Sequence, residues 1–284
     1  MNDLTINQLA MYSPWPARLL GLETWTPREK TPEEITREYE HEKWGPLLTR
    51  VRSANTGVTL EQAVRWAVGE TGPSLFCSKE SLQLLPPFLA YERYVDFVCA
   101  TLDEHATASA LVELGAGYGG ILLNLAKRRE FAEKQILAGE YTASGEELIC
   151  RLASAEGLKV RSGRCDFSRT PICDFDLPQG SLIYTSYATP YVRELGESFV
   201  EGLAAFRPQA VVHFEPCLEH CDSNTLMGLM RQRYIDVNGY NRNLVTLLRA
   251  QEQAGKIRIL SEVPAMIGIN PLLVASVVAW APTT

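Results

Sequence analysis

From residue 108 onward, short apolar runs alternate with stretches of helical periodicity, and this alternation limits the fold more than any other feature of the sequence. The runs that read as strands are ALVELG (110–115), QILAGE (135–140), LKVRSG (158–163), SLIYTS (181–186) and AVVHFE (210–215). The helical stretches lie near residues 118–129, 144–156, 191–206 and 223–235. Strands that alternate with helices pair in parallel through right-handed crossovers, so the sequence predicts an open α/β sheet.

The C-terminal part has a different pattern. KIRIL (256–260) and LLVASVVAW (272–280) flank the segment PAMIGINP, and no helical stretch separates them. Two strands without a helix between them form a hairpin. We therefore expect a terminal hairpin in which one edge strand is antiparallel to the rest of the sheet.

The first 105 residues read as a helical region with proline-marked breaks. Helices are expected at about residues 32–44, 59–69 and 86–102. The run Thr31-Pro32-Glu33-Glu34 is typical of a helix start, with Thr as the N-cap, Pro in the first position and acids in the first turn. The sequence thus predicts a helical N-terminal lid or substrate region (1–105) in front of an α/β domain (106–284).

Composition limits the partners. The net charge of −7 and the isoelectric point near 5.3 argue against nucleic acid, whose binding needs clustered Lys and Arg. No run of eighteen apolar residues is present, and the N-terminal MNDLTINQLAMYSPWP lacks the pattern of a secretory signal. We expect a cytoplasmic protein without a membrane partner, in which the seven cysteines are reduced thiols.

The stretch LVELGAGYGG follows a predicted strand and opens a predicted helix. Glycine there lets the backbone turn tightly and approach a ligand closely. A phosphate-binding P-loop is excluded because no Lys-Ser or Lys-Thr follows Gly120. The spacing of Gly115, Gly117 and Gly120 satisfies GxGxxG, and Glu140 lies about where a dinucleotide fold has its ribose-binding acid. Glu113, however, points to the place of a pyrophosphate, where a carboxylate repels an anion and attracts an ammonium group.

The pattern E-x-G-x-G-x-G at residues 113–119 resembles the first motif of class I S-adenosylmethionine (SAM) dependent methyltransferases, and the order of elements over about 110–284 agrees with that family. The resemblance implies a Rossmann-like seven-stranded sheet and SAM as the cofactor. The SAM contacts that it implies are Glu113 with the backbone of Gly115, Ala116, Gly117 and Gly119 at the amino-acid end, Glu140 at the ribose, and Tyr141, Asp166 and Phe167 at the adenine. Asp166 can also be a simple turn cap.

Candidate residues for the reaction follow the last two parallel strands. Amine methyltransferases of this family often carry an Asn or Asp, two prolines and an aromatic residue after the fourth strand, and this chain keeps only Pro190-Tyr191. Tyr184, Tyr187 and Tyr191 can partly surround a sulfonium, because its charge is attracted to ring faces; core packing is the alternative.

The run HFEPCLEHC (213–221) contains two His, two Cys and two Glu, but it has no CxxC or HExxH spacing, so we predict no metal site. Glu215 and His220 are instead candidate general bases, since ligands of open α/β sheets bind at the carboxyl ends of strands. A helix cap is the alternative for His220.

Two further groups are candidates for substrate contacts. Asn241 and Arg242 lie where the acceptor pocket of the family is usually roofed, and Arg242 can hold a carboxylate through two hydrogen bonds. Tyr12 and Trp15, with other N-terminal aromatic residues such as Trp44, offer surface for a lid that excludes water. Tyr12 and Trp15 can equally be core residues.

The leading hypothesis is in-line SN2 methyl transfer from SAM to a small molecule of secondary metabolism, with a possible homodimer as the assembly. SPWPARLLGLE (13–23), GEYTAS and the tyrosine-rich stretch are also similar to the bacterial azetidine-2-carboxylate-forming SAM cyclases. That resemblance implies attack of the SAM amine on its own γ carbon and release of methylthioadenosine. A non-catalytic SAM-binding protein is the third hypothesis.

Overall fold

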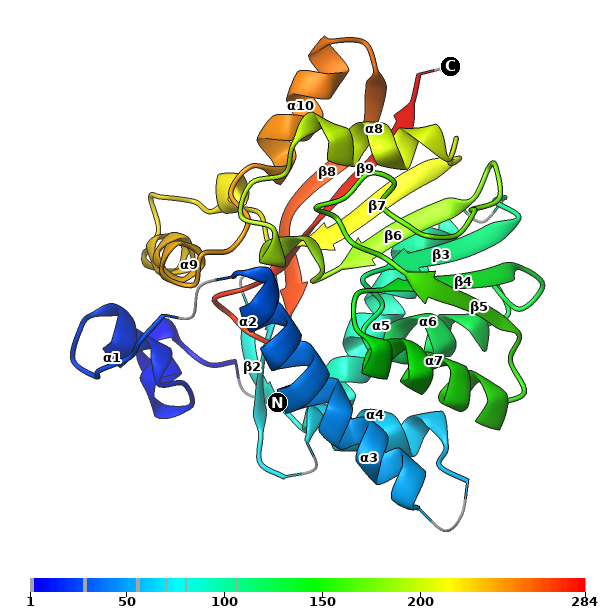
Figure 1. Ribbon diagram of the computed structural model, residues 1–284. Helices are drawn as coiled ribbons and strands as arrows, with labels where there is room; N and C mark the ends of the chain where they lie inside the picture. Colours follow the sequence, from blue (N-terminus) through cyan, green and yellow to red (C-terminus); the bar gives the residue numbers. More distant parts are fainter. Residues whose placement is uncertain are drawn as a thin grey trace.

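The computed structural model describes residues 3–27, 30–54, 57–69, 71–79, 81–105 and 107–283. Five parallel strands form the centre of a single sheet: β3 (Ala110–Leu114), β4 (Gln135–Glu140), β5 (Val160–Arg164), β6 (Leu182–Ser186) and β7 (Ala210–Glu215). They lie in the order β7-β6-β3-β4-β5 (Figure 1). The five predicted strands are confirmed, with ends that differ by at most two residues. Short apolar strands that alternate with helices form a parallel sheet, because the helices then bury both faces of the sheet.

The predicted C-terminal hairpin is confirmed as β8 (Ile257–Gly268) and β9 (Ala275–Pro282), which pair antiparallel. Its predicted place at the edge is wrong. β9, the hairpin strand that runs antiparallel to the five central strands, lies between β7 and β8 inside the sheet. The first six residues of β9 are all buried, and a strand covered on both faces needs a neighbour on each side.

Two further strands correct the prediction of an all-helical N-terminal region and of a seven-stranded sheet. β1 (Ser74–Ser78) and β2 (Ser81–Leu85) form a hairpin, and β1 pairs with β8, so the sheet has nine strands in the order β2-β1-β8-β9-β7-β6-β3-β4-β5. Each strand has five residues, a length at which periodicity does not distinguish a strand from a loop. The predicted boundary between the two regions adjoins Ala106, which lies outside the described residues.

The three predicted N-terminal helices are present, but the first is longer than predicted. α2 (Pro32–Thr36), the π-helix η2 (Arg37–Trp44) and α3 (Gly45–Ser53) follow one another without a break and form what we call the N-terminal rod. The Thr31 hydroxyl accepts a hydrogen bond from Glu34 N at 3.3 Å, as an N-cap does. α4 (Leu60–Val68) and α5 (Pro87–Asp103) follow.

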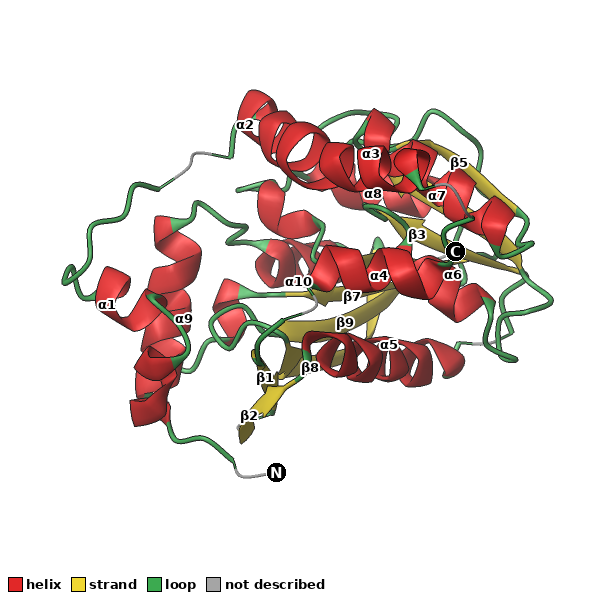
Figure 2. Cartoon of the chain, turned by 90° about the horizontal axis from the view of Figure 1, so that it is seen from below, coloured by secondary structure: helices red, strands yellow, loops and turns green. Residues whose placement is uncertain are grey.

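Helices cover both faces of the sheet (Figure 2). α4, α5, α6 (Gly120–Ala126) and α7 (Ala143–Ala155) share one hydrophobic core with the sheet, whereas α8 (Glu197–Ala205) and the unpredicted α10 (Leu244–Gln253) share the other. α9 (Leu226–Val237) contacts α1 (Trp15–Leu19) and belongs to a smaller cluster beyond the sheet. Among the described helices, none has both the length and the apolar character that a membrane crossing requires.

Candidate functional site

A cavity of about 750 Å³ lies at the carboxyl ends of the parallel strands, where ligands of open α/β sheets bind. Its walls come from the segments after β3, β4, β5 and β6 and from the N-terminal rod. The predicted SAM contacts that line it are Glu113, Gly115, Ala116, Gly117, Glu140, Tyr141, Asp166 and Phe167. Gly119 is the exception: it is the left-handed N-cap of α6, behind the loop.

The glycine loop approaches its neighbours too closely for a side chain. Gly115 has φ +79°, and a Cβ on it would lie 2.3 Å from Cβ of Ala188. Gly117 has φ +58°, and a Cβ there would lie 3.0 Å from the Trp44 ring. The loop therefore needs glycine both for its left-handed backbone and for the contact that closes the cavity.

Glu140 ties the end of β4 to this loop. Its Oε2 accepts a hydrogen bond from Gly117 N at 2.7 Å. Its Oε1 accepts bonds from Thr142 N at 3.0 Å and from Thr142 Oγ1 at 2.6 Å. Burial raises the pKa of this carboxyl, while the donors oppose that rise. A carboxylate offers about four lone-pair directions, so capacity for a further donor remains.

Glu113 stands at the end of β3 and is 2% exposed. Its Oε2 accepts a hydrogen bond from Leu122 N at 3.1 Å, in the first turn of α6. Burial raises the pKa of Glu113 to about 8. The side chain both caps α6 and lines the cavity.

The predicted adenine contacts come from the turns after β4 and β5. Asp166 Oδ1 accepts hydrogen bonds from Ser168 N at 3.0 Å and from Ser168 Oγ at 2.6 Å, as a turn cap does. Asp166 also lines the cavity. Phe167 packs edge-on against Phe199, with ring centroids 5.3 Å apart. The Tyr141 ring lies 5.2 Å from the Arg164 guanidinium carbon.

Of the three predicted sulfonium tyrosines, Tyr187 and Tyr191 line the cavity and Tyr184 does not. Tyr184 is fully buried opposite Glu113 in the β3–β6 register. The Tyr187 hydroxyl donates to the Leu273 carbonyl oxygen at 2.9 Å. Burial raises the pKa of Tyr191 well above its usual range, so that this hydroxyl stays neutral.

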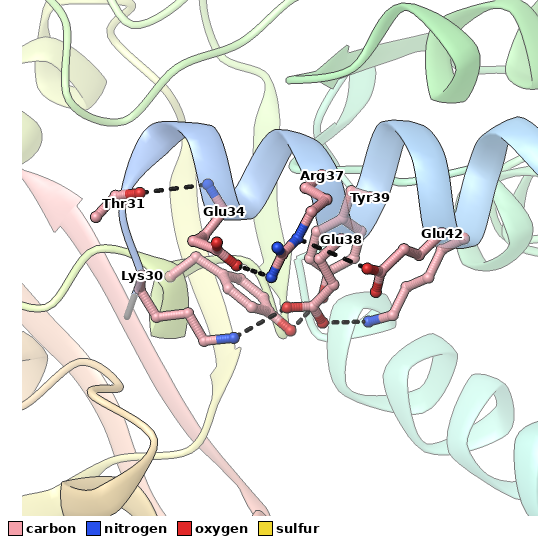
Figure 3. A network of polar contacts seen from close by, with 9 residues as sticks. Lys30, Thr31, Glu34, Arg37, Glu38, Tyr39 and Glu42 are labelled. Carbon is pink, nitrogen blue, oxygen red and sulfur yellow. Dashed lines mark hydrogen bonds and ion pairs between the residues drawn. The ribbon is translucent and has the colours of Figure 1, made fainter. Parts of the chain in front are cut away.

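The N-terminal rod closes the cavity, and sequence reasoning missed most of its contribution. Pro32, Ile35, Tyr39, Lys43 and Trp44 line the cavity, as does Lys30 just before the rod. Glu38 joins the two lysines: its Oε2 lies 3.0 Å from Lys30 Nζ (Figure 3), and its Oε1 lies 2.7 Å from Lys43 Nζ. Tyr39 donates a hydrogen bond to the Tyr191 hydroxyl.

A sequence signal for this face of the rod did exist. Ile35, Tyr39 and Lys43 are spaced four residues apart, which places them on one side of a helix. Trp44 was expected only as lid surface, and its ring centroid lies 5.0 Å from that of Tyr118. The rod is anchored to the sheet domain by Glu40 Oε2, which accepts from Ser144 N at 3.1 Å.

The two predicted general bases do not line the cavity. Glu215 is fully buried, and its Oε1 accepts from Ala188 N at 3.1 Å. Burial raises the pKa of Glu215 to about 7. His220 Nε2 lies 3.0 Å from Glu262 Oε1, away from the lining residues.

The predicted substrate contacts also lie outside the cavity lining. Asn241 Oδ1 accepts from Leu244 N at 3.0 Å, which caps α10, and Arg242 pairs with Asp236 at 2.5 Å. Trp15 packs edge-on against Trp25 and Tyr234, with centroids 4.8 and 4.5 Å away, and Tyr12 is 41% exposed. Over the described ranges, no three His, Cys, Asp or Glu side chains are grouped so as to hold a metal ion.

Comparison with known proteins rests on structure. No family model matches the sequence, and no curated protein matches it significantly. Magnesium protoporphyrin IX methyltransferase (ChlM) from Synechocystis PCC 6803 with bound S-adenosylhomocysteine matches with a TM-score of 0.52 at 12% identity, over 88% of this chain and 100% of that one. The same enzyme with bound SAM matches with a TM-score of 0.51 at 11% identity, over 92% and 100%.

The small RNA methyltransferase HEN1 matches with a TM-score of 0.50 at 14% identity, over 68% of this chain and 25% of that one. At such identities the likeness concerns the fold alone. Together with the strand order, it confirms the prediction of a Rossmann-like class I methyltransferase fold, here enlarged by the β1–β2 hairpin.

Proposed function

We propose that the protein binds SAM in this cavity and is a SAM-dependent transferase that acts on a small molecule. One observation supports the proposal: the acids and glycines expected to contact SAM end or follow three separate strands, and all of them except Gly119 line a single cavity. ChlM, which has the same fold, was crystallised with SAM and with S-adenosylhomocysteine. The cavity volume lies within the range usual for small-molecule sites.

In this proposal each end of SAM meets the group that suits it. The amino-acid end lies against Glu113 and the glycine loop, and the ribose hydroxyls donate to Glu140. The adenine lies between the turns that carry Tyr141 and Phe167. A dinucleotide suits the site less well, because its pyrophosphate would face the Glu113 carboxyl.

The proposed reaction is methyl transfer by in-line SN2 displacement. The acceptor atom forms a bond to the methyl carbon, the sulfur–methyl bond breaks, and S-adenosylhomocysteine leaves. Neutral tyrosine rings at 39, 187 and 191 favour the sulfonium, and the N-terminal rod keeps water away from it. Most of the acceleration then comes from positioning.

Glu215 has a positioning role in this scheme. Its bond to Ala188 N holds the backbone that packs directly against Gly115. Because it is buried outside the cavity lining, it reaches SAM only through that contact. Tyr184 would also influence SAM indirectly, because it lies opposite Glu113 on the neighbouring strand.

A second candidate is cyclisation of SAM itself. It is favoured by the position of the side chains expected to serve a separate acceptor. All six of them lie outside the cavity lining: Glu215, His220, Asn241, Arg242, Tyr12 and Trp15. In this reaction the SAM nitrogen loses one proton and bonds to the γ carbon, the γ carbon–sulfur bond breaks, and methylthioadenosine leaves with azetidine-2-carboxylate as the other product. No second substrate is required.

Incubation of the purified protein with SAM, followed by mass spectrometry, tests both reactions. Methylthioadenosine with azetidine-2-carboxylate from SAM alone means cyclisation. S-adenosylhomocysteine that appears only after small-molecule metabolites are added means methyl transfer. SAM that binds and stays unchanged under all conditions would contradict a transferase and leave a non-catalytic SAM-binding protein.

A further inference from the structure

We propose that Glu113 is a neutral carboxylic acid until a ligand binds, and that it releases its proton to solvent when the ammonium group of a zwitterionic nucleoside enters beside it. The cavity would thereby select nucleosides that carry an α-amino group. The inference rests on the proposed function, because it takes SAM and S-adenosylhomocysteine as the ligands.

The surroundings of Glu113 disfavour a lone negative charge. The side chain is 2% exposed, and its hydrogen-bond partners are neutral groups: Leu122 N at 3.1 Å and the Tyr184 hydroxyl, both of which partly offset the rise of the pKa that burial causes. A buried carboxylate without a nearby cation is costly, so it binds a proton instead. The rise of the Glu113 pKa to about 8 by burial agrees with this geometry.

Within the described part of the chain, the titratable groups that face Glu113 from neighbouring elements supply no positive charge. They are Tyr91 and Tyr94 of α5, Tyr118 of the glycine loop, Tyr184 of β6, Glu140 of β4 and Glu215 of β7. The tyrosines are neutral because burial raises the pKa of each, and the two glutamates add only negative charge. This cluster therefore favours the protonated form of Glu113.

The cations that line the same cavity are engaged elsewhere or lie at its rim. Lys30 and Lys43 are both paired with Glu38, which stands between them. Arg193 is an exposed residue beside Gly239. A ligand ammonium would thus be the cation that Glu113 lacks, and formation of the ion pair would release one proton.

Calorimetry with the full chain tests this with three ligands at pH 6 and 7, each in two buffers of different ionisation heat. SAM and S-adenosylhomocysteine should release about one proton each, and their dissociation constants should fall about tenfold from pH 6 to pH 7. The sign follows from the raised pKa: below about 8 the proton must leave before the pair forms, so affinity rises with pH.

Methylthioadenosine is the matched control, because it keeps the adenine and ribose but has no ammonium. It should release no such proton, and any contribution from Glu140 is common to all three ligands and can be subtracted. Proton release by methylthioadenosine equal to that of SAM would overturn the inference. So would SAM binding without proton release.

The variant Glu113→Gln gives the second measurement. It should bind SAM more weakly than the unchanged protein does at pH 7, because Gln cannot form the ion pair with the ammonium, and it should lose the pH dependence. Its affinity for methylthioadenosine, which has no ammonium, is retained and reports an intact site. A variant that keeps the tenfold dependence would overturn the inference. If none of the three ligands binds the unchanged protein at any pH, the proposed function itself fails, a result distinct from binding without proton release.

Discussion

The two halves of the cavity are built in different ways. In the nucleoside half, Glu113 and Glu140 end neighbouring parallel strands, and backbone N–H groups hold both carboxyls. In the lid half, the N-terminal rod meets the sheet domain through side chains such as Tyr39, Tyr191 and Trp44. The first half is fixed by strand register, and the second by contacts between surfaces far apart in the sequence.

This difference separates binding from turnover. Strand-held groups are in place before the ligand arrives, so changes to them should act mainly on SAM affinity. The rod touches the cavity through side-chain contacts, and elements that cover a site in this way exclude water from the reaction. Changes to the rod should therefore act mainly on the rate of product formation.

The largest effect is expected for Gly115→Ala, in the nucleoside half. A residue with Cβ costs roughly 1–2 kcal/mol in a left-handed backbone, and the contact with Ala188 adds about 1–3 kcal/mol of overpacking. We expect the free energy of unfolding to fall by the sum in denaturant titration, and SAM binding to be lost. Gly21→Ala is the control, because Gly21 has φ +72° but nothing within 4 Å. Equal losses of unfolding free energy in Gly115→Ala and Gly21→Ala would refute the close contact between residue 115 and Ala188.

Glu140→Ala should come next. Loss of a charge-assisted contact to the ribose should weaken SAM binding at least tenfold, about 1.4 kcal/mol, in calorimetry. The control is Glu147→Ala, which removes a half-buried acid paired with Arg52 and Arg151, outside the cavity lining, and should leave the affinity unchanged. Unaltered SAM affinity in Glu140→Ala, with an unaltered melting temperature, would remove the nucleoside assignment.

Tyr39→Phe probes the lid half. It removes the hydrogen bond to Tyr191 and keeps the ring, so the contact between the rod and the sheet domain loses about 1 kcal/mol of free energy. We expect kcat for the product found with SAM to fall about fivefold, while the dissociation constant for SAM changes less than about twofold. Tyr12→Phe, exposed and outside the cavity, should change neither. A loss of affinity as large as the loss of kcat would mean that the two halves do not differ in this way.

The smallest effect is expected for Lys43→Met, at an exposed position in the middle of the rod. The Lys43 side chain is 42% exposed, and exposed ion pairs contribute about 0–1 kcal/mol. Turnover should change less than about twofold, and less still at high salt. Lys30→Met should have the larger effect, since the Lys30 side chain is 8% exposed and lies 5.0 Å from the Tyr191 ring. The reverse order would contradict the assignment of Lys30 as the buried partner of Glu38.

The nucleoside half was predictable because its signals are local. The alternation of predicted strands and helices is enough to place Glu113 at the end of a strand, two residues before Gly115. The same pattern indicated that Glu140 ends the next strand, beside the loop, and the parallel β3–β4 pairing confirms that position. The roles of these residues in binding stay predictions.

The rest depends on contacts that no short stretch of sequence contains. His220 and Arg242 follow strand or helix ends, as binding residues often do, yet their partners are Glu262 and Asp236. Tyr39 belongs to the cavity because Tyr191 meets it from 152 positions away. β1 and β2 form strands because β8 offers them an edge, which local propensity does not reveal.

The interior position of β9 sets an order of assembly for the chain. The β1–β2 hairpin is synthesised early, but the strand with which it pairs is β8, and β9 lies between β8 and the parallel strands in the order of the sheet. Residues beyond Ala275 must therefore be synthesised before the hairpin can join the same sheet as the parallel strands. Until then the open side of β7 stays unpaired, and this interval is where the nascent chain would most need a chaperone.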